Sequence, residues 1–172
     1  MLPVKNDLSE SVRDEVIPLL QARLADGLDL LRHIKQAHWN VKGPNFIALH
    51  KLFDKVYEEI EEGADLVAER LVQLGGIAEG TSQSVAKRTS LPEYSLKLVD
   101  WKDHIEALSN SLSVYAKAVR KAVDQADEMK DQGTSDLFTQ LSRDVDKNLW
   151  MVESHGILER REGASKSVKG VA

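Results

Sequence analysis

The sequence predicts an all-α protein, a four-helix bundle with one long crossover between its second and third helices. Only 10 glycines and 4 prolines occur among 172 residues. Their combined share is below the roughly 12% of an ordinary globular chain, so we expect few turns and long elements. Apolar residues recur three and four residues apart over four long stretches, which is the spacing of one buried helix face. The length is typical of a single domain.

The first two helices have recognisable ends. Asp7 and Glu10 have the spacing of a capping box, which predicts that the first helix begins near them. Its apolar residues continue to about Trp39, and the Gly-Pro-Asn turn at 43–45 ends it. The second helix is expected over about 46–74, where two glycines follow.

Two further helices are expected in the second half of the chain, after an irregular stretch. The crossover over 75–100 is rich in serine, threonine and glycine and can hold a short helix. A third helix is expected over about 102–130. A fourth runs over about 134–158, with Thr134 or Ser135 as its N-cap.

Composition excludes several classes of protein. No window reaches 18 uninterrupted apolar residues, so no membrane-spanning helix is expected, and the first residues lack the apolar stretch of a secretory signal. The chain has no cysteine, which excludes disulfides and thiolate metal sites. We therefore expect a cytoplasmic protein without membrane partners, divided into an N-terminal arm over 1–14, a bundle over 15–159 and a flexible basic tail over 160–172.

The second predicted helix carries an acidic face beside its apolar one. On this face His50 and Asp54 are four residues apart, and Asp65 and Glu69 repeat the spacing, which lets two side chains share one ligand. The ordinary interpretation is a solvated helix surface, and the alternative is a metal site. Imidazoles with carboxylates suit iron, zinc or manganese, and the absence of thiolates favours the harder ions.

Helix geometry puts a condition on such a site. Asp54 and Asp65 are 11 residues apart, which is ~16 Å along one helix axis. The two pairs can therefore meet only if a second copy lies antiparallel across a two-fold axis. His38, near the end of the first helix, can complete the site because the short turn returns the chain beside His50. Alone, it would be interpreted as a histidine interacting with the helix dipole.

Several segments resemble the Dps family, the miniferritins named as DNA-binding proteins from starved cells. The likeness lies in residues 35–46 and 49–54, in 65–70 with 73–76, and near the C-terminus in 142–150. It covers about 15–158 and implies a ferritin-like bundle assembled into a hollow dodecamer. It also implies a di-iron ferroxidase centre between subunits, with these ligands: His38, His50 and Asp54 from one subunit, Asp65 and Glu69 from its neighbour.

The resemblance implies a function in iron storage and detoxification. Such proteins oxidise Fe(II), commonly with hydrogen peroxide, and store the Fe(III) mineral, which protects DNA from oxidative damage. In that setting Trp39 packs over the site or quenches radicals, its alternative being a packed aromatic at a helix end. Glu58 and Glu61 are expected to nucleate mineral inside the shell, the alternative being ordinary solvation. Asp127, Asp131 and Asp136 are expected to line an iron pore.

DNA binding has weaker support from the sequence. The chain carries a formal charge of −5, which does not attract nucleic acid. The tail over 160–172 has four basic residues against one glutamate, and several copies can bind phosphates weakly and in a salt-sensitive way. The basic residues are Arg160, Arg161, Lys166 and Lys169. Association with the nucleoid would follow from such binding.

Three alternatives remain open at this level. The first is a structural, DNA-compacting scaffold with little ferroxidase activity. The second is a di-iron oxygenase or reductase with its centre inside one bundle, but such centres use Glu-x-x-His pairs, and none occurs in this chain. The third is a centre occupied by zinc, which also takes imidazole and carboxylate ligands. His33, His104 and His155 fall outside these motifs and are expected at the surface or at an interface.

Overall fold

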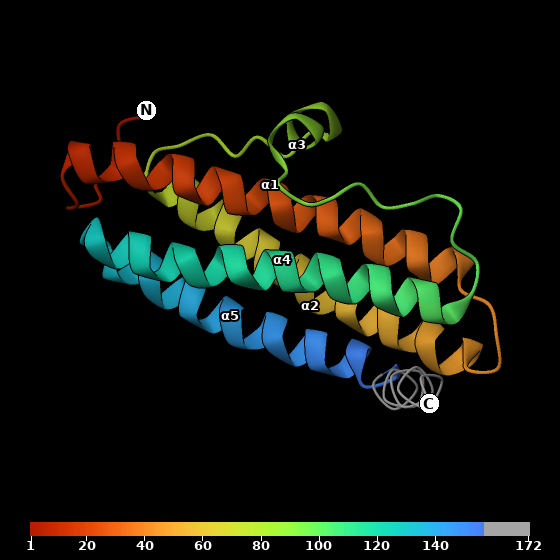
Figure 1. Cartoon of the computed structure of the whole chain (residues 1–172). Helices are drawn as coiled ribbons and strands as arrows, with labels where there is room; N and C mark the ends of the chain where they lie inside the picture. Colours follow the sequence, from red (N-terminus) through yellow and green to blue (C-terminus); the bar gives the residue numbers. More distant parts are fainter. Residues whose placement is uncertain (157–172) are drawn as a thin grey trace, which may run out of the picture.

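The computed structural model describes residues 1–156, and the predicted four-helix bundle with a long crossover is confirmed (Figure 1). Four long helices lie side by side and the short α3 sits outside α1. No strand forms among the described residues, where one isolated bridge joins Lys42 to Asp100. The helices are α1 (Glu10–Asn40), α2 (Phe46–Gln73), α3 (Ser82–Arg88), α4 (Trp101–Glu128) and α5 (Gln132–Glu153).

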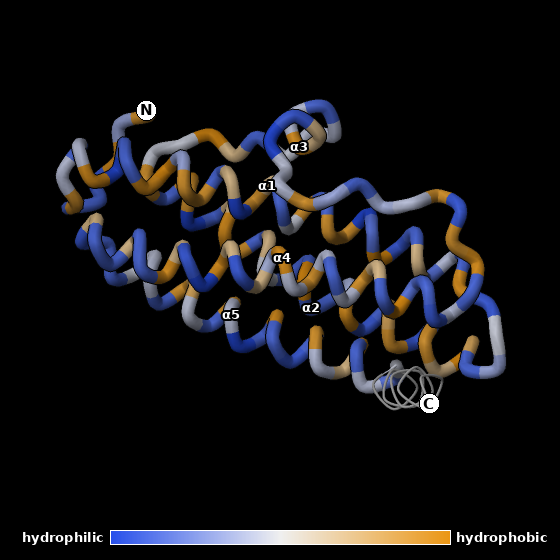
Figure 2. The backbone as a smooth tube through the Cα atoms, viewed as in Figure 1, coloured by the Kyte–Doolittle hydropathy of each residue, from blue (hydrophilic) through white to orange (hydrophobic). Residues whose placement is uncertain are grey.

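The bundle consists of two helical hairpins, α1 with α2 and α4 with α5, joined by the crossover (Figure 1). Apolar residues recur along each long helix (Figure 2), and their buried sides form one continuous core. Large side chains from three helices are fully buried in it: Phe53 of α2, Tyr115 of α4 and Phe138 of α5. Burial of this apolar face, at about 25 cal/mol per Å², is the main reason why the helices associate.

The N-terminus of α1 differs from the predicted capping box. Ser9 is the N-cap, and its hydroxyl accepts a hydrogen bond from the Val12 N–H at 3.3 Å. The helix therefore begins inside the segment 1–14 that was predicted as an arm. The residues before it are bound to the end of α2, where the Leu2 N–H donates to the Gly75 carbonyl at 2.7 Å.

The turn between α4 and α5 also corrects a prediction. Asp131, and not Thr134 or Ser135, is the N-cap of α5, and its carboxylate accepts bonds from the N–H and hydroxyl of Thr134 at 3.0 and 2.6 Å. Arg70 of α2 donates to the same carboxylate at 2.7 Å. A buried carboxylate with four possible acceptor directions is thereby satisfied by its neighbours.

The described part of the chain ends shortly after α5. This helix ends at Glu153, before the predicted boundary near 158. The basic tail predicted over 160–172 lies outside the described residues. None of the helices within 1–156 is long and apolar enough to cross a membrane.

Candidate metal centre

The end of α1 and the start of α2 bring together His38, His50 and Asp54, each offering a ligand atom within 4.8 Å of the others. Among the residues described, this is the one group of three or more metal-binding side chains. The connection from Asn40 to Phe46 is short, so the last turn of α1 faces the first turns of α2. Spacing within α2 then puts Asp54 one turn beyond His50, on the same side.

The turn itself is held by the start of α4. Gly43 has φ +137°, a conformation that residues with a side chain rarely adopt, and a Cβ there would collide with the Trp101 ring. On either side, the Lys42 N–H donates to the Val99 carbonyl at 3.1 Å, and the Trp101 N–H donates to the Lys42 carbonyl at 3.1 Å. Glycine is needed here because the backbone packs against an indole.

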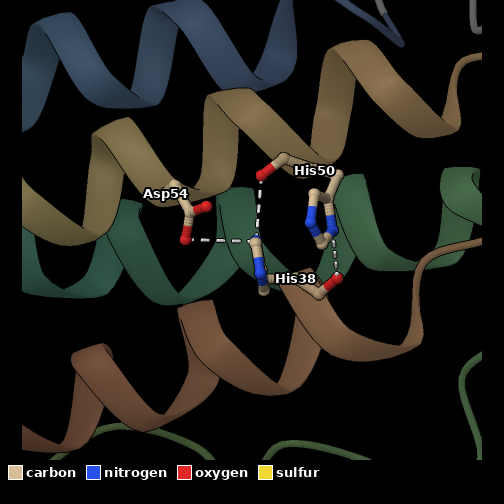
Figure 3. Close-up of side chains that lie close together, drawn as sticks. All are labelled: His38, His50 and Asp54. Carbon is tan, nitrogen blue, oxygen red and sulfur yellow. Dashed lines mark hydrogen bonds and ion pairs between the residues drawn. The ribbon is translucent and has the colours of Figure 1, made fainter.

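The two histidines orient each other through reciprocal bonds (Figure 3). His38 Nδ1 lies 2.9 Å from the His50 carbonyl, and His50 Nδ1 lies 3.0 Å from the His38 carbonyl. A carbonyl oxygen only accepts, so both Nδ1 atoms carry hydrogen. In the neutral tautomers the Nε2 lone pairs are therefore free to bind a metal. The rings are stacked with centroids 3.7 Å apart.

Lys35 holds the third member of the cluster. Its ammonium Nζ donates to Asp54 Oδ1 at 2.6 Å and lies 4.6 Å from the centre of the Tyr57 ring. This hydrogen bond lowers the pKa of the Asp54 carboxyl below its ordinary value; slight burial opposes the effect and the charges of His38 and His50 add to it. Asp54 Oδ1 also lies 3.3 Å from His38 Nδ1. The carboxylate is thus charged and already paired with a cation.

Asp65 and Glu69 lie elsewhere on the same helix. Both are exposed, and neither belongs to the cluster of three. Neither side chain forms a hydrogen bond or ion pair with another residue of the described chain. Their separation from Asp54 follows from the continuous run of α2 between them. Within one chain the structure brings three of the five predicted ligands together and leaves these two apart.

The remaining predicted residues have distinct environments. Trp39 is 68% exposed at the end of α1, so it is not packed as a core aromatic within this chain. Glu58 and Glu61 are exposed on α2, and Glu61 accepts a hydrogen bond from the Tyr57 hydroxyl at 3.0 Å. Phe46, which the sequence analysis did not single out, places its ring 5.1 Å from the His50 ring.

The three predicted pore residues also separate. Asp127 and Asp136 are exposed near the α4–α5 turn. Asp131 is only 1% exposed and is bound to Arg70 and Thr134, so in this fold it is a structural cap and its carboxylate does not face solvent. The family resemblance placed Asp131 in the lining of a pore, but its position as the N-cap of α5 explains its burial.

The sequence analysis missed two residues near the site, Lys35 and Tyr57. Lys35 is three residues before His38 on α1, so it lies on the same side of the helix and faces α2. Tyr57 is three residues after Asp54 and supplies the ring beneath the ammonium. Helical spacing from the predicted ligands would have found both.

Comparison with known proteins identifies the family and the fold. A family profile for the ferritin-like domain matches residues 17–160. A protein of Agrobacterium fabrum called "DNA protection during starvation protein" is 44% identical over 151 residues, which cover 88% of this chain and 93% of the relative. A protein of the same name from Mycolicibacterium smegmatis is 32% identical and covers 86% of this chain and 80% of its own.

Solved structures resemble the whole bundle. The tetragonal form of Mycobacterium smegmatis Dps superposes with a TM-score of 0.85 at 30% identity and covers 90% of this chain and 93% of that one. Dps from Microbacterium arborescens "in the high iron form" gives a TM-score of 0.79 at 31% identity, with coverage of 86% and 95%. The likeness therefore extends over nearly the full length of both proteins.

Proposed function

This chain belongs to the Dps family of ferritin-like proteins, and from that premise we propose that it oxidises Fe(II) and stores the product as Fe(III) mineral. The centre that we propose is shared by two copies of the chain. His38, His50 and Asp54 come from one copy, and Asp65 and Glu69 come from the other.

One regularity of α2 carries this proposal. His50 and Glu69 have their midpoint between residues 59 and 60, and Asp54 and Asp65 have the same midpoint. A second copy that lies antiparallel about a two-fold axis through this point would put each acidic pair opposite the other copy's cluster. Two equivalent centres result from one interface, and each has five ligands. Within a single chain, the ~16 Å rise between Asp54 and Asp65 prevents such a centre.

Exposed apolar residues on α2 fit the same arrangement. Ile47 is 60% exposed and Val72 is 50% exposed, and helical projection puts both on the side of Asp54. Their midpoint again lies between residues 59 and 60. Apolar side chains at both ends of a polar helix face are expected where that face is covered by a partner.

The ligand set suits iron as a substrate. Two Fe(II) ions bound together supply the two electrons that reduce one hydrogen peroxide, with two protons, to two waters. The chain's part is to hold the ions with neutral Nε2 atoms and to balance their charge with carboxylates. The Lys35 ammonium lies 2.6 Å from Asp54 Oδ1, so its positive charge opposes a cation that binds to the same carboxylate.

The rest of the proposal concerns the assembly. A hollow dodecamer would enclose the mineral, with Glu58 and Glu61 as nucleating carboxylates and the exposed Asp127 and Asp136 near an entry pore. Trp39, exposed beside His38, would be covered in the assembly or would quench radicals. Oxygen is the alternative oxidant, and zinc is the ion expected to compete for the centre.

The relatives are named for a broader function, the protection of DNA during starvation. We propose that this chain protects DNA chiefly by removing iron and peroxide in the bacterial cytoplasm. The four basic residues of the tail offer a weak second contact with the nucleoid. A scaffold that compacts DNA without oxidising iron is the competing function.

Anaerobic titration with Fe(II), followed by hydrogen peroxide, tests the proposal. Saturable binding and rapid oxidation to a soluble mineral are expected of the native protein, and both should be lost when His50→Ala and Asp54→Ala are combined. Asp14→Ala, which removes an exposed carboxylate from α1, is the matched control and should behave as the native protein. Absence of binding in the native protein would favour the scaffold, and tight zinc binding without oxidation would favour the zinc centre.

A further inference from the structure

Two histidines outside the metal centre are buried where the crossover meets the bundle. His33 of α1 is 6% exposed and His104 of α4 is 1% exposed. Of the two expected locations, the surface is wrong, and both rings lie at a contact within the chain. Between them lies Tyr94 of the crossover, itself 8% exposed. A residue of the crossover is therefore packed between two titratable rings.

The contacts of these rings are specific. Tyr94 Oη lies 2.8 Å from His104 Nδ1, and the Tyr94 ring centre lies 5.1 Å from that of His33. His33 Nδ1 lies 3.0 Å from the Ser111 hydroxyl. The other nitrogen of His104, Nε2, is buried without a hydrogen-bond partner in the part of the chain described. A proton added to either ring would create a buried charge.

The segment 89–99, which we call the strap, is held mainly by side chains. It runs from α3 along the bundle to α4 without helix or strand, with a bend at Leu91 and a turn at 96–97 (Figure 1). No backbone-to-backbone hydrogen bond fixes 90–98 in the described structure. Ser90 donates its N–H and hydroxyl to the buried Asp26 at 2.7 and 3.0 Å, and Thr89 donates to Asp29 at 2.8 Å. The rest of the strap is held by Tyr94 with its two histidines and by Leu91 and Leu98, which pack against the core.

Charged groups near His33 do not offset its burial. Asp29 Oδ1 lies 3.7 Å from His33 Nε2, and Arg32 and Glu93 line the same cavity of about 540 Å³. Burial lowers the pKa of His33 and Asp29 raises it by less.

The surroundings of His104 shift its pKa in the same direction. Burial lowers its pKa, whereas the Leu98 backbone, Asp103 and Asp100 act in the opposite direction with smaller effect. Both rings are thus held neutral while the strap is docked. In a released strap they meet water and take up protons at an ordinary pKa of about 6.5.

We propose that the strap is an acid-sensitive latch, docked at neutral pH and released when His33 and His104 are protonated. The sign follows from linkage: the released state binds more protons, so docking weakens as the pH falls below about 6.5. The far end of the strap is bonded to Lys42, in the turn that joins His38 to His50. Release would therefore loosen the turn beside the metal centre, although the latch itself does not depend on the proposed iron chemistry.

Hydrogen–deuterium exchange on the full-length assembly tests the latch. The peptide covering the strap is compared between about pH 7.5 and about pH 5.5, after correction for the intrinsic rate, with 105–116 of α4 as internal reference. This range stays above the values at which carboxylates ordinarily take up protons. Opening of the strap is expected to rise by about tenfold or more at the lower pH while the reference changes little.

Variants distinguish the effect of protonating His33 and His104 from other effects of low pH. Combining His33→Gln with His104→Gln should abolish the response, whereas His155→Gln, which removes an exposed histidine from the end of α5, should preserve it. If the double variant does not fold, NMR titration of the native histidines replaces it. Two buried rings that titrate at an ordinary pKa, or a strap that stays closed after both have titrated, would overturn the proposal.

Discussion

At the scale of the residue, the cluster is organised by bonds that sequence patterns do not encode. Helical spacing predicted that His50 and Asp54 share a side of α2 and that the short turn returns His38 to them. The reciprocal bonds between each Nδ1 and the other histidine's carbonyl depend on the distance between α1 and α2. Side-chain tautomers and hence the identity of the ligand nitrogen could be assigned only from those distances.

Lys35 supplies the first prediction at this scale. Its ammonium neutralises Asp54 at 2.6 Å, so Lys35→Met should strengthen binding of Co²⁺ or Zn²⁺ by a few-fold to about tenfold, a gain limited by the solvent exposure of the carboxylate. Isothermal titration of the metal-free protein measures the change. Lys55→Met is the control, because Lys55 lies 3.9 Å from Glu59 and does not contact the cluster. Equal affinity in the native protein and in Lys35→Met would show that the ammonium does not compete with the ion.

Gly43 gives a second prediction. An alanine at φ +137° would be strained and its Cβ would meet the Trp101 ring, so Gly43→Ala should lower the free energy of unfolding by about 1–3 kcal/mol and weaken metal binding. Urea unfolding at fixed protein concentration measures the first effect. Gly80→Ala is the control because its Cβ would meet only Leu28 Cδ1, at 3.3 Å. An unchanged unfolding midpoint in Gly43→Ala would contradict this account of the turn.

At the scale of the element, helices were easier to predict than their ends. Apolar periodicity located all four long helices, since the buried face of a helix must repeat every three to four residues. Caps depend on single side chains, and Ser9 and Asp131 replaced the predicted ones. His33 and His104 fall outside the metal motifs and were expected at the surface or at an interface, but both are buried where the crossover meets the bundle. The path of a long connection is set by tertiary contacts, which no local pattern reveals.

The turn between α4 and α5 provides the prediction at this scale. Arg70→Ala would leave the buried Asp131 carboxylate without its cation, and a loss of about 3 kcal/mol in the free energy of unfolding is expected. Arg120→Ala is the matched control, since Arg120 pairs with Asp146 on an exposed surface, where such pairs contribute less than about 1 kcal/mol. Chemical denaturation of both variants measures the difference. Similar losses in the two variants would mean that burial of Asp131 does not govern the effect.

At the scale of the whole molecule, the proposed centre cannot be completed within a single chain. Three of the five proposed ligands lie together near the start of α2. The other two, Asp65 and Glu69, lie further along this helix, and their side chains have no partner in the described chain. The sequence predicted this division from the rise of a helix, but one chain cannot display the partner that would unite the two parts. Three pairs of α2 residues share one midpoint, which is the property expected of a two-fold interface. They are His50 with Glu69, Asp54 with Asp65, and Ile47 with Val72.

The tail gives a prediction about DNA at the same scale. Removal of 160–172 takes away four basic residues and one acidic residue, so any mobility shift of DNA at low salt should disappear with it. Electrophoresis of the native and truncated proteins at two salt concentrations measures this. A shift of unchanged size in the truncated protein would assign DNA binding to another surface.

Complementation between two defective variants tests the shared centre most directly. One variant combines His50→Ala with Asp54→Ala, the other combines Asp65→Ala with Glu69→Ala, and each alone should fail to bind Co²⁺ at the centre. When the two are dissociated, mixed in equal amounts and reassembled, about one quarter of the centres should receive a full set of ligands, with recovery of Co²⁺ absorbance and of peroxide-dependent Fe(II) oxidation. No recovery in a properly reassembled mixture, or full binding by the variant that lacks Asp65 and Glu69, would contradict a centre built from two copies.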